Sequence, residues 1–285
     1  MAVMGSVAVG TVDGLKRYPV KSMLGEELTS CGVTERGLDG DRRLALIDPA
    51  TGKVGSAKNP RLWRRTLKLA AVSGPGTGPV TISFPDGAVR GADDPDIDAA
   101  LSEFLGRPVT LSAEPPSGAE LDRAVPEEVL RSGVVATVRS MILEIGAAAP
   151  AGTFFDFAPV HLLTTSTLDA IAGASPRGAV EAERYRPNLI IRTSSGPGFA
   201  ENDWAGRELR IGDEVILQVE ARSPRCAIPT LEHGDLPRDT DALRVPAARN
   251  RIRPADGLDP EPCAGVYARV IRPGQVRAGD QVSLH

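Results

Sequence analysis

The sequence predicts a mainly β protein with small helical additions (α+β), built from β-barrels. Short strand-like runs recur throughout the 285 residues, and turns separate them, as the 30 glycines and 24 prolines indicate. Two segments, 210–217 and 277–284, share a pattern in which a Gly-Asp turn leads into an alternating strand. Few segments are typical of helices. These observations predict barrel strands that are entered through similar turns.

The N-terminal part of the chain contains short predicted strands and one helix. A proline ends the first strand and places Lys21 and Ser22 on a loop. The helix is expected to have Asp94 as its N-cap and Pro95 at its first position, and to end at Gly106. The predicted strands of this part are 7–12, 27–33, 42–48, 67–72, 80–84 and 109–113.

The Pro-rich stretch 114–118 is the best linker in the sequence, and a weakly patterned stretch follows it up to about residue 152. We therefore place a domain boundary at this linker. It separates a smaller N-terminal β-barrel-like domain, residues 1–115, from a C-terminal β-barrel domain, residues 116–285.

The C-terminal part contains further strands and one long connection. A strand near residue 160 is expected to end in a hydroxyl-rich turn that caps a helix from about Leu168. Strands are also predicted at 189–191 and 214–220. The Arg- and Pro-rich stretch 233–262 is expected to be a long excursion loop.

Composition and charge disfavour several classes of function. With a formal net charge of −4, the chain has no basic field for nucleic acid. It has no apolar run of membrane-spanning length and no secretory signal, so we expect a cytoplasmic protein without membrane contact. The three cysteines lack metal-type spacing, which disfavours a zinc or iron–sulfur site built from this chain alone.

Cys226 is the best candidate for a functional thiol. It lies where the strand 214–220 gives way to a proline-bounded loop, directly after Arg225. Nearby positive charge favours the thiolate, which is the nucleophile and the metal ligand. For an arbitrary cysteine a small buried apolar side chain is the commoner interpretation, and we expect that role for Cys31 and Cys263.

Side chains that suit oxyanions recur beside Pro and Gly turns. Each one alone is explained by a solvated charge or a helix cap, whereas the set indicates a phosphate-bearing or otherwise anionic cofactor. No P-loop or dinucleotide-binding glycine motif is present. The residues of the set are Lys21, Ser22, Arg42, Thr165, Ser166, Thr167, Arg186 and Asn188.

A hydrolase triad has little support in the sequence. There is no G-x-S-x-G motif. His161 follows a proline at a strand start and is expected to be structural, while His285 is the final residue. A Cys226–His233 pair lacks an orienting third member.

Several short motifs occur in order over nearly the whole chain. None is specific alone, but together they resemble the MOSC family, named for the C-terminal domain of molybdenum-cofactor sulfurases, with its usual N-terminal β-barrel partner. The motifs are Tyr18-Pro19-Val20-Lys21-Ser22, Gly40-Asp41-Arg42, Pro159-Val160-His161-Leu162-Leu163-Thr164-Thr165, Arg184-Tyr185-Arg186-Pro187-Asn188, Glu201-Asn202-Asp203-Trp204, Arg225-Cys226 and Gly265-Val266-Tyr267-Ala268-Arg269-Val270.

Within that family the sequence is similar to the amidoxime-reducing molybdenum proteins. The resemblance implies a molybdenum–pyranopterin cofactor (molybdopterin), a metal bound by Cys226, and reduction of N-hydroxylated small molecules. It implies that Lys21, Ser22 and Arg42 contact the phosphate end of the cofactor. Further implied cofactor contacts come from Thr165, Ser166, Thr167, Arg186, Asn188 and Arg225.

Two departures from the family pattern leave alternatives open. Relatives commonly have a Thr-Thr pair after the cysteine, whereas Ala227-Ile228 follows it here, so the substrate-side loop differs. The sequence ends at His285 without the ferredoxin-like domain of some relatives, so we expect a separate ferredoxin- or flavin-type electron-donor protein. The alternatives are a carrier of the cofactor or of persulfide sulfur without its own turnover, and a non-catalytic β-barrel protein.

Overall fold

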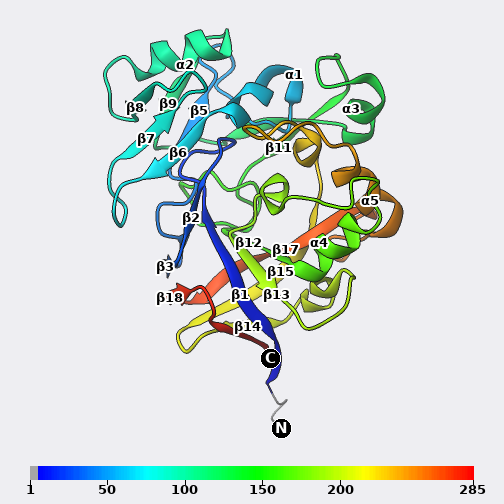
Figure 1. Ribbon diagram of the computed structural model, residues 1–285. Coiled ribbons are helices and arrows are strands. Elements are labelled where there is room, and N and C mark those ends of the chain that lie inside the picture. The colour runs from blue at the N-terminus through cyan, green and yellow to red at the C-terminus, as the bar shows by residue number, and fades with distance from the viewer. Residues whose placement is uncertain (1–5) are drawn as a thin grey trace.

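The computed structural model describes residues 6–285, and a closed seven-stranded β-barrel forms the centre of this part of the chain (Figure 1). In spatial order its strands are β12 (Val160–Thr164), β13 (Leu189–Arg192), β1 (Val7–Arg17), β19 (Gln281–Leu284), β14 (Glu208–Ile211), β15 (Val215–Pro224) and β17 (Glu261–Arg272). β17 pairs back to β12, which closes the ring, and only the β12–β13 pair is parallel among these strands. The predicted mainly β fold is confirmed.

Alternation of apolar and polar residues explains how the barrel strands bury one face. Along β15 every second residue is buried, so that Val215, Leu217 and Val219 lie in the barrel core. The turns that follow β14 and precede β19 are the two Gly-Asp turns of the repeated pattern. Both turns lead into barrel strands, as the sequence predicts.

The first strand of the chain belongs to this barrel, because β1 pairs with β13 on one side and β19 on the other. The strand is longer than the predicted 7–12, since β2 (Glu26–Leu28) continues its pairing up to Arg17. β3 (Ser30–Thr34) pairs with β4 (Gly37–Leu38) and with β18 (Gly274–Arg277). The domain boundary near residue 115 stays a prediction.

A smaller β-rich unit covers the end of the barrel that lies away from the C-terminus (Figure 1). Apolar side chains from its strands and helices form a second core beside that of the barrel. Its elements are β5 (Ala45–Ile47), β6 (Ala70–Ser73), β7 (Val80–Ser83), β8 (Val89–Gly91), β9 (Thr110–Ser112), α1 (Pro60–Trp63), η1 (Arg64–Lys68) and α2 (Ile97–Leu105).

Two boundaries in this unit differ from the prediction. The predicted strand 67–72 begins only at Ala70, because residues 64–68 form a 3₁₀ turn. The N-cap of α2 is Asp96, not Asp94, whose carboxylate instead accepts a hydrogen bond from the Gly91 amide at 2.8 Å. The helix ends at Gly106 with φ of +70°, as expected for a left-handed C-cap.

The stretch 119–145, which has little pattern in the sequence, is ordered into β10 (Glu120–Ala124), α3 (Pro126–Ser132) and β11 (Ser140–Glu144). The two strands pair as an antiparallel hairpin around the short helix. β11 leaves Met141 and Ile142 exposed, so its apolar residues do not mark a buried face.

The predicted excursion loop 233–262 is also wrong in part, since it contains α5 (Asp241–Arg249) and β16 (Arg251–Ile252). Pro246 lies inside α5. Proline lacks a backbone N–H and is therefore rare inside helices, so its presence in the sequence argues against a helix here. The helix packs its buried face, with Ala242 and Val245, on the helix α4 (Thr165–Ala172). None of the helices within residues 6–285 is both long and apolar enough to cross a membrane.

Candidate functional site

A cavity of about 560 Å³ lies between the barrel and the segments that cover its end. Seven of the residues that the sequence singles out line it, although they come from both ends of the chain. A volume of this size suits a cofactor or a small substrate. The seven residues are Lys21, Ser22, Arg42, Arg186, Asn188, Arg225 and Cys226.

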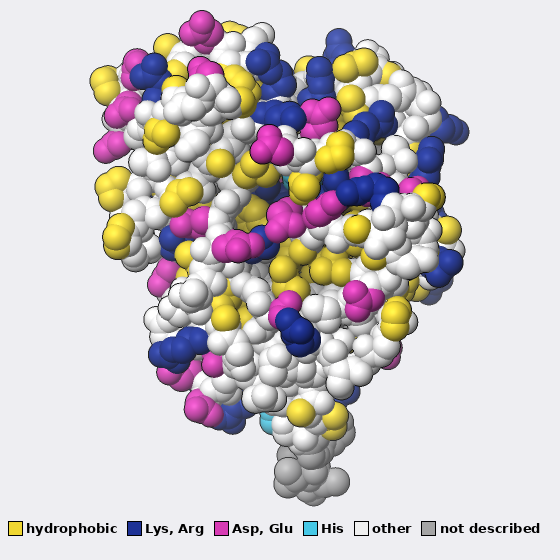
Figure 2. Space-filling model, in the orientation of Figure 1, with side chains coloured by type: hydrophobic (Ala, Val, Ile, Leu, Met, Phe, Trp, Pro, Cys, Tyr) yellow, Lys and Arg dark blue, Asp and Glu magenta, His cyan; other side chains and the backbone are white. Residues whose placement is uncertain are grey.

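The cavity wall is strongly cationic. Eight of its residues are Lys or Arg, and three are acidic, namely Glu144, Asp156 and Asp256. The face of the molecule in Figure 2 differs, because it carries Lys and Arg interspersed with Asp and Glu rather than a continuous basic field. Positive charge is thus concentrated in the cavity of a chain whose net charge is −4.

Cys226 lies two residues after the end of β15, is half-buried and lines the cavity. The chain leaves the barrel here and turns into η4 (Ile228–Thr230). Of the three free cysteines, Cys31 and Cys263 are buried, as the sequence predicts. Cys226 is therefore the thiol that a ligand in the cavity can reach.

Arg225 is fixed in the wall by the backbone around it. Its Nε donates to the Ser223 carbonyl at 3.1 Å, and its Nη1 donates to the Tyr185 carbonyl at 3.2 Å. Its Nη2 lies 3.5 Å from Nε2 of His161. These contacts hold a guanidinium charge next to Cys226 in the chain.

His161 lines the cavity, whereas the sequence suggests only a structural residue. Burial, and next the charge of Arg225, hold its pKa well below the usual range. The ring is thus neutral. Its Nδ1 lies 3.4 Å from the Arg186 carbonyl and donates a hydrogen bond to it. Nε2 is then free to accept from Arg225.

Backbone strain marks the cavity independently of residue type. Within residues 6–285, three non-glycine residues have positive φ, and all three line the cavity: Ser22 at 65°, Arg42 at 45° and Arg186 at 57°. Such conformations cost about 1–3 kcal/mol each and concentrate at functional sites. No sequence signal identifies them, because glycine is the residue expected at positive φ.

Arg186 has a hydrogen-bond donor that no described residue satisfies. Its Nη1 donates to the Met23 carbonyl at 2.6 Å, and its guanidinium lies 4.3 Å from the centre of the Tyr18 ring. Its Nη2 is buried without a hydrogen-bond partner among residues 6–285. Burial also lowers its pKa to about 10, so an anionic partner would stabilise its charge.

Arg42 is held by neighbouring polar groups. It pairs with Asp41, and it donates to the Asn188 Oδ1 at 3.2 Å and to the Arg186 carbonyl at 3.3 Å. The Asn188 amide in turn donates to Asp41 at 3.0 Å and accepts from the His161 backbone. Asn188 therefore uses both ends of its side chain on protein partners and orients the arginine.

Lys21 shares one carboxylate with a residue that the sequence analysis misses, Lys58. Lys21 Nζ lies 2.6 Å from Asp156 Oδ1, and Lys58 Nζ lies 3.1 Å from Asp156 Oδ2. Burial lowers the pKa of Lys21 to about 8, although Asp156 opposes this shift. Burial also raises the pKa of Asp156, but the two lysines outweigh this and hold it below its usual range.

The three residues of the predicted hydroxyl turn, Thr165, Ser166 and Thr167, do not line the cavity. Thr165 Oγ1 accepts from the Thr193 amide at 3.3 Å, and the Ser166 hydroxyl lies 3.0 Å from that of Thr164. Thr167 donates to Glu201 at 2.7 Å. The residues instead build the start of α4, which begins at Thr165, three residues before the predicted Leu168, with Thr164 as N-cap.

Glu201 is the buried centre of this hydroxyl cluster. It accepts from Thr164 Oγ1 at 2.5 Å, from Thr167 and from the Gly265 amide at 2.8 Å. The cluster ties the β12–α4 turn to β17. Burial raises the pKa of Glu201, although these hydrogen bonds oppose the shift.

We expect Glu201 to make stability depend on pH in one direction. The pKa of Glu201 is higher in the folded than in the unfolded protein. Its contribution to stability is therefore complete below the unfolded-state pKa and is lost as pH rises through the folded-state pKa. Wild type should therefore gain in stability relative to Glu201→Gln at low pH: the difference between their free energies of unfolding, wild type minus variant, should be larger at about pH 4 than at about pH 8. Urea unfolding of both proteins at each pH measures this, and a difference of opposite sign would contradict it.

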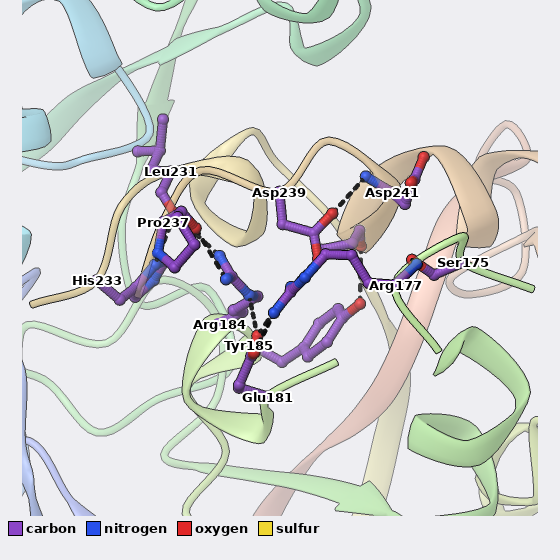
Figure 3. A network of polar contacts seen from close by, with 11 residues as sticks. Ser175, Arg177, Glu181, Arg184, Tyr185, Leu231, His233, Pro237, Asp239 and Asp241 are labelled. Atoms are coloured by element: carbon purple, nitrogen blue, oxygen red, sulfur yellow. Dashed lines mark hydrogen bonds and ion pairs between the residues drawn. The ribbon is translucent and has the colours of Figure 1, made fainter. Parts of the chain in front are cut away.

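Figure 3 shows how the loop after Cys226 is attached to the segment that carries Arg186. Arg184, fully buried, donates to the Leu231 carbonyl at 3.1 Å, to the Pro237 carbonyl at 2.8 Å and to Glu181 at 2.5 Å. Arg184 belongs to η2 (Ala182–Tyr185), directly before Arg186. One side chain thus connects the two segments that bring Arg186 and Cys226 to the cavity.

The chain belongs to the family of MOSC-domain proteins with an N-terminal MOSC barrel. The MOSC domain matches residues 150–283, and the MOSC N-terminal beta barrel domain matches residues 9–108. The class is linked to molybdenum-cofactor sulfurases, and the cationic cavity with its single accessible thiol is consistent with molybdenum binding. A search of curated proteins finds no match.

Solved structures show only distant similarity. The YUAD protein from Bacillus subtilis is 11% identical with a TM-score of 0.43, over 97% of this chain and 96% of that one. YiiM from Geobacillus stearothermophilus is 13% identical with a TM-score of 0.30, over 45% and 54%.

Proposed function

We propose that the cavity binds the molybdenum–pyranopterin cofactor (molybdopterin) and that the Cys226 thiolate binds its metal. The observation that carries this proposal is the combination, in one cavity, of a reachable thiol and of Arg186, which has a buried guanidinium nitrogen without a partner among residues 6–285. Thiolates are ligands of transition metals, and guanidinium groups bind phosphate. The donor set therefore fits a cofactor with a metal at one end and a phosphate at the other.

Under this proposal the phosphate end is held by Lys21, Ser22, Arg42 and Arg186. The hydroxyl oxygen of Ser22 accepts from the Ala57 amide at 3.1 Å, which leaves its proton free for an anion. The strained backbones of Ser22, Arg42 and Arg186 are fixed in advance, so that little reorganisation accompanies binding. Asn188 acts by orienting Arg42.

The proposed reaction is reduction of N-hydroxylated small molecules. When bound, the cofactor supplies the two-electron chemistry that removes the oxygen. The protein supplies a partly apolar pocket at the cysteine end, where Ile228, Pro229 and Tyr267 line the wall. A separate ferredoxin- or flavin-type protein delivers the electrons in this proposal.

The test begins with the purified protein from a host supplied with molybdate. We expect molybdenum and pterin in equal amounts, and reduction of benzamidoxime to benzamidine when a reduced viologen dye supplies electrons. Protein without either component would contradict cofactor binding. Cofactor without any turnover would contradict the reductase and favour the carrier alternative.

A further inference from the structure

Lys58 and Arg123 line the cavity but have no part in the proposed cofactor contacts. They come from two segments that lie side by side, since the Ala124 amide donates to the Lys58 carbonyl at 3.0 Å. Both segments pack around the cysteine loop: Ala57 shares an apolar cluster with Cys226, and Ala124 shares another with Ala227. Arg123 therefore lies at the thiol end of the cavity, and Lys58 lies between the thiol and Lys21, with which it shares Asp156.

Arg123 retains an unsatisfied donor. The residue is only 8% exposed, and its Nη2 donates to Glu261 at 2.7 Å. Its Nε is buried without a hydrogen-bond partner among the described residues. A buried donor of this kind costs free energy unless a ligand satisfies it.

Lys58 has capacity for a further anion as well. Its one acidic partner, Asp156, is shared with Lys21. The other acidic side chains of the cavity wall are Glu144 and Asp256, and neither pairs with Lys58 or Arg123. Burial opposes the charged form of both side chains, but nearby groups outweigh it and raise the pKa of each, led by Asp156 for Lys58 and by Cys226 for Arg123.

We propose that Lys58 and Arg123 form an anion subsite at the thiol end of the cavity, which selects N-hydroxylated substrates that also carry a carboxylate. The substrate class rests on the proposed function. An ammonium group and a guanidinium nitrogen without a partner suit a carboxylate, whose two oxygens accept from both. A neutral substrate would offer no negative charge to the Lys58 ammonium and the Arg123 guanidinium in the cavity wall, and this difference is the source of selectivity.

The first test compares two probes on the cofactor-loaded protein: benzamidoxime and 4-carboxybenzamidoxime. We expect wild type to favour the carboxylated probe in kcat/KM by about tenfold, and Lys58→Gln or Arg123→Gln to remove most of this preference. Arg123→Lys should retain part of it. Lys53→Gln, which removes a lysine paired with Asp122 outside the cavity, is the matched control and should keep the wild-type ratio.

The second test needs no cofactor, so it separates the subsite from the proposed function. Cys226 is alkylated with iodoacetate or with iodoacetamide; the sulfur–carbon bond forms as iodide leaves, and mass spectrometry follows the peptide. A cationic subsite accelerates the anionic reagent, so the rate ratio of iodoacetate to iodoacetamide should fall about threefold in each Gln variant. The ratio should also fall with added salt.

Two results would overturn the proposal. One is a rate ratio that stays at the wild-type value in both Lys58→Gln and Arg123→Gln. The other is loss of molybdenum and pterin from both variants while they remain folded, since the two residues would then belong to the cofactor site itself.

Discussion

A Cys226→Ala variant is expected to contain at least about tenfold less molybdenum than wild type and to lose N-reduction in proportion. The proposal assigns the metal one protein thiolate, and alanine offers no replacement ligand. The phosphate end of the cavity is unchanged in this variant, so some pterin should remain bound. Elemental analysis and pterin fluorescence on the same preparations measure both components.

The matched control for this variant is Cys263→Ala. Cys263 is fully buried in β17, and its Sγ lies 3.7 Å from the Ile252 carbonyl, so the control removes a thiol without changing the cavity wall. We expect the control to keep its molybdenum while losing on the order of 1 kcal/mol of stability. Full molybdenum occupancy in Cys226→Ala would refute the metal assignment.

Arg184→Met is expected to lower the free energy of unfolding by about 3–5 kcal/mol. Methionine fills a similar volume but removes the donor of the Pro237 carbonyl, and it leaves the buried Leu231 carbonyl with His233 Nδ1, 3.1 Å away, as its remaining partner. It also removes the attachment between η2 and the loop after Cys226, so cofactor content should fall together with stability. Urea unfolding of the cofactor-free protein measures the stability change separately.

Arg177→Met is the natural comparison, because Arg177 pairs with Glu181 and Asp239 in the same network (Figure 3) but lies at the surface. Exposed ion pairs contribute little to stability, so a clearly smaller loss is expected. Equal losses in the two variants would show that burial of Arg184 is not the source of its effect.

The barrel and part of the cavity could be predicted because their signals are local. The predicted strand 214–220 rests on consecutive residues and corresponds to most of β15, and the turn that presents Lys21 and Ser22 is marked by its own proline. Residue type also suggests anion binding for Arg42 and Arg186. It cannot show that both backbones are held at positive φ, since that strain is imposed by the surrounding fold.

The remaining residues depend on contacts between distant segments. Lys58 and Arg123 meet through a backbone hydrogen bond from Ala124, which no periodicity indicates. The residue types of the hydroxyl turn, residues 165–167, suit phosphate, but the structure does not place the turn at the cavity. The carboxylate of Glu201, 34 residues away, accepts the hydrogen bond of the Thr167 hydroxyl instead, and only the folded chain reveals this.

The position of β1 between β13 and β19 has a consequence for how the protein is made. The ribosome synthesises β1 more than 250 residues before β19, so the edge of β1 that pairs with β19 has no partner during that interval. Closure of the barrel therefore has to wait until β19 has been synthesised, and pairing over such sequence separation is slow. Until then, the exposed edge of β1 is where nascent chains would associate with one another.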